Sequence, residues 1–322
     1  MDESEKVADS LRAAKMYYYQ NLTTEAIARE MCVSRSTVSR LLSFAKQEGF
    51  VEIRINDPQD HPRQLEAKIQ QAFGLKRIHV VPMAENTGEM DRLERVAQYT
   101  ANYLSTIFSS DMILGVAWGT TTSAVSRNLV PKTTHNSQIV QLNGAGNTES
   151  LGVEYASEIL MRFAKNYQAG YHLFPVPAFF DRVHTKNALW EETSVKRILD
   201  LQARADVYLY SIGAVNAGIP SHVHIESYLN KADYQELKKA GVVGDIATIF
   251  FREDGSFHNI SINQRSSGPD ISMLKNKQAI CVISGQAKLK GLYAAIQGSL
   301  LTELILDEPA ARVFVERFID KE

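Results

Sequence analysis

From residue 75 onward, short apolar runs alternate with stretches of helical spacing, and this alternation limits the possible folds more than any other feature. Most of the runs are apolar almost throughout, as strands covered on both faces are. They occupy residues 78–81, 113–118, 139–142, 207–212, 246–251, 279–284 and 303–306. Strands that alternate with helices are typical of an open, mostly parallel α/β sheet. We therefore expect a large Rossmann-like α/β domain over residues 75–322.

The first 56 residues carry a different pattern, of short helices followed by one strand. Apolar side chains at helical spacing predict helices near residues 7–18, 23–31 and 34–46. Hydroxyls at Thr23–Thr24 and at Ser34 suit the starts of the second and third helices. Residues 50–55 alternate as a strand does. We expect residues 1–56 to form a winged helix-turn-helix domain.

A linker is predicted between these two parts. Residues 57–62 hold two prolines and two acids, a composition that breaks both helix and strand patterns. A short helix from about residue 63 to residue 73 follows. The linker and its helix together span residues 57–74 in this prediction.

Composition narrows the function through what it leaves out. The 322 residues include 35 Lys and Arg against 37 Asp and Glu, so any surface for nucleic acid has to be a local patch. The two cysteines, Cys32 and Cys281, have no partners at metal-ligand spacing and cannot form a disulfide framework. The sequence has neither a signal-peptide pattern at its start nor an apolar run of about 18 residues. We expect a cytoplasmic protein that does not enter a membrane.

The segment TTEAIAREMCVSRSTVSRLL, residues 23–42, carries the strongest functional signal. Its second helix has a polar outer face, whereas Val38, Leu41 and Leu42 belong to the core. Short hydroxyls let a helix sit deep in the major groove of DNA, and arginine reaches a guanine edge or a phosphate. A solvated amphipathic helix without a partner is the alternative. The expected DNA contacts are Thr24, Ser34, Arg35, Ser36, Thr37, Ser39 and Arg40.

In the larger domain, polar or glycine-containing turns follow four predicted strands, at residues 119–122, 143–146, 213–214 and 285–288. Ligands of open parallel sheets bind at the carboxyl ends of the strands, so these turns predict one pocket. Backbone N–H groups and hydroxyls at a helix start suit an anion such as phosphate, with Lys288 as its cationic partner. A plain helix cap and a surface lysine are the alternatives.

Asn143 and Asp245 could hydrogen-bond the hydroxyls of a sugar, or could merely shape their turns. The full set of expected effector-binding residues is Gly119, Thr120, Thr121, Thr122, Asn143, Gly144, Gly213, Asp245 and Lys288.

The chain resembles the SorC/DeoR-type family of sugar-responsive transcriptional regulators. The resemblance rests on V-S-R-x-T-V-S-R-L-L at residues 33–42, followed by Ala45, Gly49, Val51 and Ile53. In the larger domain it continues through WGTT, QLNGAG, VVGDI and SGQAKLKGLYAAIQGSLLTELILDEPAA. It implies double-stranded operator DNA as a partner, a phosphorylated sugar as effector, and a homodimer or homotetramer. It also implies an effector domain similar in fold to sugar-phosphate isomerases and CoA transferases.

An isomerase-like enzyme is the competing hypothesis. Isomerisation needs a positioned general base, and Asp245 and Glu149 are candidates only by elimination. Neither GxxxxGK[ST] nor GxGxxG occurs, and the pair His222 and His224 has no evident third metal ligand. We expect no catalytic residues, no metal and no cofactor. We expect the protein to be a repressor of a carbohydrate or nucleoside catabolic operon.

Overall fold

The structure, a computed structural model, describes residues 3–20, 22–51, 61–150, 152–214 and 228–320. Its contacts divide the chain into two compact units, Met1–Asp60 and His61–Glu322. Residues 52–55 of the predicted strand and most of the predicted linker lie outside the described residues. None of the described helices is long and apolar enough to cross a membrane.

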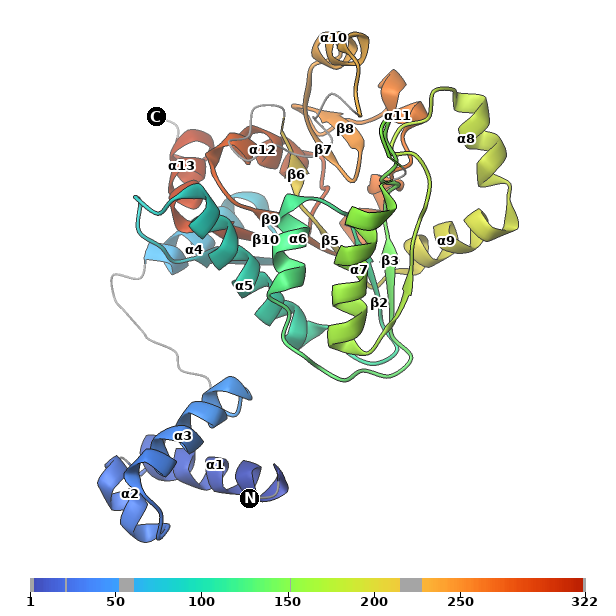
Figure 1. The fold of residues 1–322 in the computed structure, drawn as a ribbon. Coiled ribbons are helices and arrows are strands. Elements are labelled where there is room, and N and C mark those ends of the chain that lie inside the picture. Colours follow the sequence, from blue (N-terminus) through green and yellow to red (C-terminus); the bar gives the residue numbers. More distant parts are fainter. Residues whose placement is uncertain (1–2, 21, 52–60, 151, 215–227, 321–322) are drawn as a thin grey trace. The chain divides into compact units, whose positions relative to one another are not determined.

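In its described residues, the smaller unit has three helices (Figure 1), which are α1 (Glu3–Tyr18), α2 (Thr24–Glu30) and α3 (Arg35–Gln47). One face of α3 packs inward through Val38, Leu41 and Ala45, which are at most 3% exposed. Ile27 from α2 is also fully buried in this small core. The turn between α2 and α3 places Cys32 at a φ of +54°, and a helix-turn-helix results.

The larger unit alternates strands and helices as predicted. Its strands are β1 (Arg77–Val81), β2 (Ile113–Val116), β3 (Gln138–Gln141), β4 (Gly170–His172), β5 (Val207–Tyr210), β6 (Ile212–Gly213), β7 (Val242–Ile246), β8 (Ile249–Arg252), β9 (Gln278–Ile283) and β10 (Glu303–Asp307). Its helices are α4 (His61–Phe73), α5 (Glu89–Ile107), α6 (Thr120–Arg127), α7 (Val153–Tyr167), α8 (Val183–Trp190), α9 (Thr193–Arg204), α10 (Lys231–Lys239), α11 (Ser261–Arg265), α12 (Leu289–Gln297) and α13 (Glu308–Phe318), with short 3₁₀ turns at η2 (Ile271–Asn276) and η3 (Gln286–Lys288).

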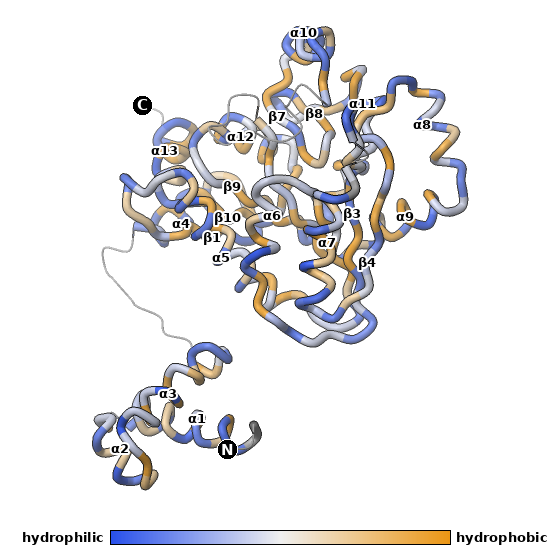
Figure 2. The backbone as a smooth tube through the Cα atoms, viewed as in Figure 1, coloured by the Kyte–Doolittle hydropathy of each residue, from blue (hydrophilic) through white to orange (hydrophobic). Residues whose placement is uncertain are grey.

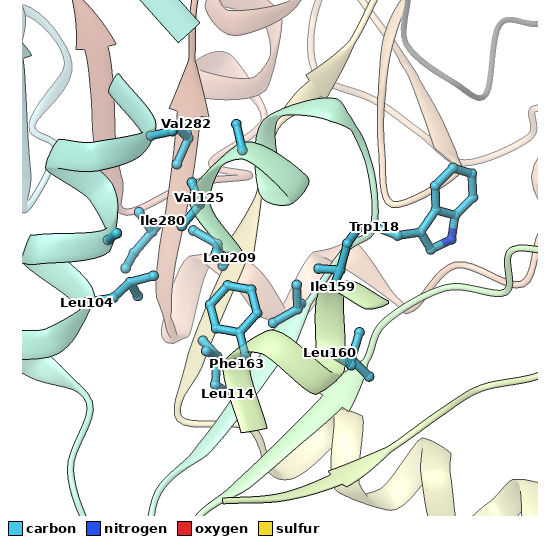
Figure 3. Packing of buried hydrophobic residues seen from close by; sticks show 14 of the residues in the cluster. Leu104, Leu114, Trp118, Val125, Ile159, Leu160, Phe163, Leu209, Ile280 and Val282 are labelled. Atoms are coloured by element: carbon cyan, nitrogen blue, oxygen red, sulfur yellow. The ribbon is translucent and has the colours of Figure 1, made fainter. Parts of the chain in front are cut away.

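Within the described residues, the main sheet has seven strands in the order β1-β10-β9-β5-β2-β3-β4, and all neighbouring pairs are parallel. Side chains alternate between its faces, so that Leu114 and Leu209 pack under α5, α6 and α7. Cys281 and Leu304 point to the opposite face, which α4, α12 and α13 cover. Burial on both faces explains the continuous apolar runs, visible as orange in the central strands of Figure 2. Figure 3 shows the first of these two cores.

One predicted strand, at residues 246–251, is wrong. The structure divides this run into β7 and β8, which pair antiparallel across a tight turn. Ala247 and Thr248 form that turn with φ of +48° and +68°, a conformation that side chains other than glycine seldom adopt. Together with β6, this hairpin makes a separate three-stranded sheet among the described residues.

The predicted strand at 207–212 is also interrupted. β5 ends at Tyr210, and Ile212–Gly213 form β6 of the smaller sheet. Gly213 therefore pairs with Asp245 inside a sheet. The turn predicted at residues 213–214 is wrong for this residue. The break leaves Ser211 between the two sheets, at the carboxyl end of β5.

Candidate functional site

The outer face of α3 is exposed in the helix-turn-helix unit. Residues 34, 35, 36, 39 and 40 are exposed, whereas Thr37 and Thr24 are half-buried. Ser34 is the N-cap of α3, as predicted, because its Oγ accepts a hydrogen bond of 3.1 Å from the backbone N–H of Thr37. The fold thus leaves this row of side chains available to a partner.

Hydrogen bonds within this face organise its hydroxyl groups. The Oγ of Ser34 lies 2.8 Å from the hydroxyl oxygens of both Ser36 and Thr37. A guanidinium nitrogen of Arg40 donates to Thr37 Oγ1 at 3.4 Å. Arg35 forms an ion pair of 2.9 Å with Glu25 of α2. Polar groups on one exposed helical face, with two arginines among them, match the requirements for phosphate and base contact.

In the larger unit, Gly119 and Gly285 leave open backbone at the ends of two strands. Gly119 has φ +153° and ψ 173° after β2, and Gly285 has φ +84° and ψ 160° after β9. These conformations are essentially limited to glycine. A Cβ atom at either residue would meet no atom within 4 Å, so close packing does not explain the glycines. They leave room for a ligand to approach the main chain.

The ammonium group of Lys288 lies between these loops. Its Nζ donates hydrogen bonds to Ser211 Oγ at 3.0 Å and to Thr121 Oγ1 at 3.4 Å. Thr121 lies in the first turn of α6 and is 3% exposed. The structure therefore brings together, at the start of a helix, two predicted residues that lie 167 positions apart in the sequence.

Ser211 completes this cluster and is not among the residues predicted from the sequence. Val116 is in register with Leu209 of β5, so Ser211 aligns with Trp118 two residues further along. The signal that could have found it is a hydroxyl at the end of an apolar run. It was obscured because the run continues through Ile212 into another strand.

Burial lowers the pKa of Lys288 from its usual 10.5 to about 8, although the nearby carboxylate of Asp245 partly opposes the shift. A bound anion strongly stabilises the charged form of a buried lysine, because it replaces the favourable electrostatic interactions with water that burial removes. Asp245 itself is 4% exposed, and its Oδ2 accepts a hydrogen bond of 3.3 Å from the N–H of Thr248. The site thus combines a cation, hydroxyl groups and a helix N-terminus.

The side chain of Asp307 holds the loop that carries Lys288. One carboxylate oxygen of Asp307 accepts from the N–H of Gly285 at 2.7 Å. The other accepts from the N–H of Ala310 at 2.9 Å and caps α13. Asp307 is fully buried, so a single side chain joins the last helix to the lysine loop.

The remaining predicted residues have several kinds of surroundings. The hydroxyl of Thr122 donates a 3.1 Å hydrogen bond to the carbonyl of Gly119 within the first turn of α6, and Thr120 is half-buried. At Gly144, a Cβ atom would lie 2.3 Å from the carbonyl oxygen of Val176, so close packing explains that glycine. Asn143, 1% exposed, follows β3 and accepts a 3.1 Å hydrogen bond from the indole of Trp118 through its backbone carbonyl.

The described residues that were candidates for an enzyme, Glu149 and Asp245, do not form one site. Glu149 is exposed in the loop after β3, and Asp245 is buried in β7. His222 and His224 lie outside the described residues. Among the described residues, no group of three or more His, Cys, Asp or Glu side chains could hold a metal ion.

A separate cavity of about 610 Å³ lies beside α8, α10 and α11 and includes none of the predicted effector residues. Arg265, its most buried cation, is already held by Asp233 at 2.5 Å and by the carbonyl of Phe180 at 3.0 Å. This cavity is therefore less suited to bind an anion than the cluster at Lys288.

Comparison with known proteins identifies the family. Residues 57–316 match the family described as "Putative sugar-binding domain". A deoxyribonucleoside regulator of Bacillus subtilis (strain 168) is 32% identical over 97% of this chain and 99% of its own length. The chain belongs to the SorC/DeoR-type family of sugar-binding transcriptional regulators. The resemblance inferred from the sequence motifs is confirmed.

Two further proteins of this type are also similar to this chain. The sorbitol operon regulator of Klebsiella pneumoniae is 25% identical over 98% of this chain and 100% of its own. Its full-length crystal structure has a TM-score of 0.70 at 23% identity, over 97% of this chain and 99% of that one, which shows a common fold. A domain of a possible sugar-binding transcriptional regulator from Arthrobacter aurescens TC1 matches 81% of this chain and 100% of its own, with 46% identity and a TM-score of 0.74.

Proposed function

We propose that this SorC/DeoR-type regulator represses a carbohydrate or nucleoside catabolic operon and responds to a phosphorylated sugar. The observation that carries the effector assignment is the buried ammonium of Lys288 beside Thr121 at the start of α6. A phosphate there would form an ion pair with the lysine and accept hydrogen bonds from the threonine hydroxyls and from the backbone N–H groups at the start of the helix. The relatives named after sorbitol and deoxyribonucleoside operons support the substrate class.

We propose that α3 enters the major groove of operator DNA. The exposed side chains on its outer face support contacts from Thr24, Ser34, Arg35, Ser36, Thr37, Ser39 and Arg40. A helix-turn-helix generally binds one half-site, so the working unit is a homodimer or homotetramer on a pseudo-palindromic operator. Relatives named as transcriptional regulators favour this role over catalysis.

Effector control follows if the sugar binds two states of the oligomer with different affinities. The ligand can change DNA affinity only as far as it distinguishes those states. The contacts in the pocket would come from Gly119, Thr120, Thr121, Thr122, Asn143, Gly144, Gly213, Asp245 and Lys288, with Ser211 added from the structure. Gly144 and Gly213 contribute by shaping the pocket walls.

One experiment tests both halves of the proposal. Fluorescence anisotropy would measure binding to a duplex from upstream of the gene, over a range of salt concentrations, with and without a panel of phosphorylated and free sugars. We expect salt-sensitive binding that one phosphorylated sugar weakens. Turnover of a sugar phosphate by the pure protein, without any duplex binding, would overturn the proposal in favour of an enzyme.

A further inference from the structure

The cavity of about 610 Å³ beside α8, α10 and α11 has the size of a small-molecule site, since such sites span about 300 to 1,000 Å³. Its described lining comes from the loop at residues 146–148, from parts of the segments 177–185 and 228–233, and from Arg265. None of the residues at the Lys288 cluster belongs to this lining. The cavity is therefore a candidate for a second ligand.

Two aromatic rings of the cavity wall are each stacked on a second ring behind them. Phe179 stacks on Phe250, with ring centroids 5.8 Å apart and an interplanar angle of 16°. Tyr228 stacks on Trp118, with centroids 5.4 Å apart and an angle of 27°. Phe179 and Tyr228 are half-buried and line the cavity, whereas the two rings behind them are buried and are not part of its described lining. A planar ring in the cavity can therefore pack against the outer side of either stack.

The two least exposed charged groups of the described lining are already paired with each other. Asp233 is 7% exposed and forms an ion pair of 2.5 Å with Arg265. The same carboxylate accepts from the N–H of Asn230 at 3.0 Å, and Arg265 also donates to the carbonyl of Phe180 at 3.0 Å. A charged ligand would find no comparable partner inside the cavity to offset the loss of its hydration. The interior therefore favours an uncharged ligand.

The rim of the cavity near the start of α8 is polar and exposed. Its side chains carry charges of both signs and a hydroxyl, and belong to Asp181, Arg182, His184 and Thr185. Such groups form hydrogen bonds with the nitrogens and carbonyls of a heterocycle and with the hydroxyls of ribose. Stacking rings beside a polar rim therefore match a nucleoside better than they match a free sugar.

We propose that this cavity binds an uncharged purine or pyrimidine nucleoside, with its base packed against Phe179 and its ribose toward the polar rim. Stacking on an aromatic side chain is available to every base, because every base has a π-face, so the inference concerns the class and not one base. The site is separate from the cluster at Lys288. The inference therefore goes beyond the proposed function and does not depend on it.

Calorimetric titration of the full chain with adenosine, guanosine, cytidine, uridine and ribose tests the class of ligand. We expect at least one nucleoside to bind the wild type and ribose not to bind. Phe179→Leu keeps an apolar side chain but removes the π-face, so nucleoside affinity should fall at least about fivefold. Phe250→Leu is the matched control, because it removes the inner ring of the same stack, and its affinity should stay within about twofold of the wild type.

Two results of these titrations would overturn the inference. Absence of binding by all the nucleosides would do so in the wild type alone, without any variant. An equal loss of affinity in Phe179→Leu and Phe250→Leu would do so as well, because it would assign the loss to packing of the pair and not to a contact with the base.

A comparison of uridine with uridine 5′-monophosphate tests the absence of charge. The rim charges are exposed and of both signs, so we expect the added phosphate to change affinity by less than about twofold. Much tighter binding of the nucleotide would make the cavity an anion site and would overturn the inference.

Ribose 5-phosphate and inorganic phosphate test whether the two sites are separate. Neither should displace the nucleoside, and displacement would mean that the cavity is the sugar-phosphate site. Failure of every sugar phosphate to bind, with nucleoside binding intact, would instead overturn the proposed effector function and leave this inference standing.

Discussion

Glu25 and Arg35 form an ion pair of 2.9 Å that joins α2 to the first residue of α3. Both side chains remain largely exposed, at 52% and 70%, so solvent screens the pair and it contributes little to the stability of the fold. Its importance lies in where it holds the guanidinium. Arg35 is one of the expected DNA contacts, and in the free protein a carboxylate competes with phosphate for it.

Replacement of this carboxylate should strengthen DNA binding. Glu25→Gln releases Arg35 and removes a negative charge beside the phosphate backbone, so we expect affinity to rise several-fold at low salt and the gain to shrink as salt increases. The unfolding midpoint should not change. Anisotropy titrations at several salt concentrations measure the effect, and Glu191→Gln, which breaks an exposed ion pair with Lys196, is the control. Weaker binding would mean that Glu25 orients Arg35 productively.

Loss of Arg40 should weaken DNA binding and leave effector binding intact. Arg40 is exposed on α3 and touches only Thr37 among the hydrogen bonds of the described residues. For Arg40→Ala we expect a roughly tenfold or larger loss of operator affinity and, if the contact is to phosphate, a salt slope smaller by about one. Arg204→Ala, an exposed arginine of the larger unit, is the control. Unchanged affinity for operator and for unrelated duplexes would refute the contact.

Loss of the Thr121 hydroxyl should have the opposite result. Thr121→Val keeps the shape of a side chain that is 3% exposed but removes the acceptor that faces Lys288. We expect at least about tenfold weaker sugar-phosphate binding with operator affinity preserved. Thr134→Val, which deletes another buried hydroxyl bonded to the carbonyl of Tyr167, controls for stability. If both variants keep the effector response, the anion site is assigned wrongly.

Phosphate binding should depend on the protonation of Lys288. Burial holds the pKa of this lysine near 8 in the free protein, and a bound anion stabilises its charged form and raises that pKa. A sugar phosphate is a phosphate monoester and is largely a dianion above about pH 7, since the second pKa of such esters is about 6. Affinity should therefore be nearly constant up to about pH 8 and then fall about tenfold per pH unit.

Calorimetry from about pH 7 to about pH 9.5, with the sugar phosphate that binds the wild type, measures this dependence through the proton linkage. Lys288→Met should bind weakly and without the decline above pH 8, because the titrating group is absent. A wild-type affinity that stays constant across the range would contradict the assignment of Lys288 as the phosphate partner.

Local features of the fold could be predicted from sequence because they depend on a few neighbouring residues. The cap at Ser34 is confirmed, since its Oγ accepts a hydrogen bond from the N–H of Thr37, three residues later. Most strands were also found, because burial on both faces leaves a continuous apolar run. Thr121 and Lys288 were paired correctly by the rule that ligands gather at strand ends.

The remaining features depend on contacts between distant parts of the chain. The run at residues 246–251 contains no glycine or proline to mark a turn, yet the buried Thr248 adopts a positive φ there. β4 was missed because it is a three-residue edge strand without an apolar run. Asn143 gave no signal that its buried Oδ1 would lack a donor among the described residues, since only the assembled loop shows which groups surround it.

β1 begins at Arg77 but pairs with β10, whose last residue is Asp307. Synthesis of the chain must therefore reach Asp307 before the sheet can close and before Asp307 can secure the loop of Lys288. The three helices of Met1–Asp60 need no such distant partner. During translation, the part that reads an operator can consequently mature well ahead of the part that senses a metabolite.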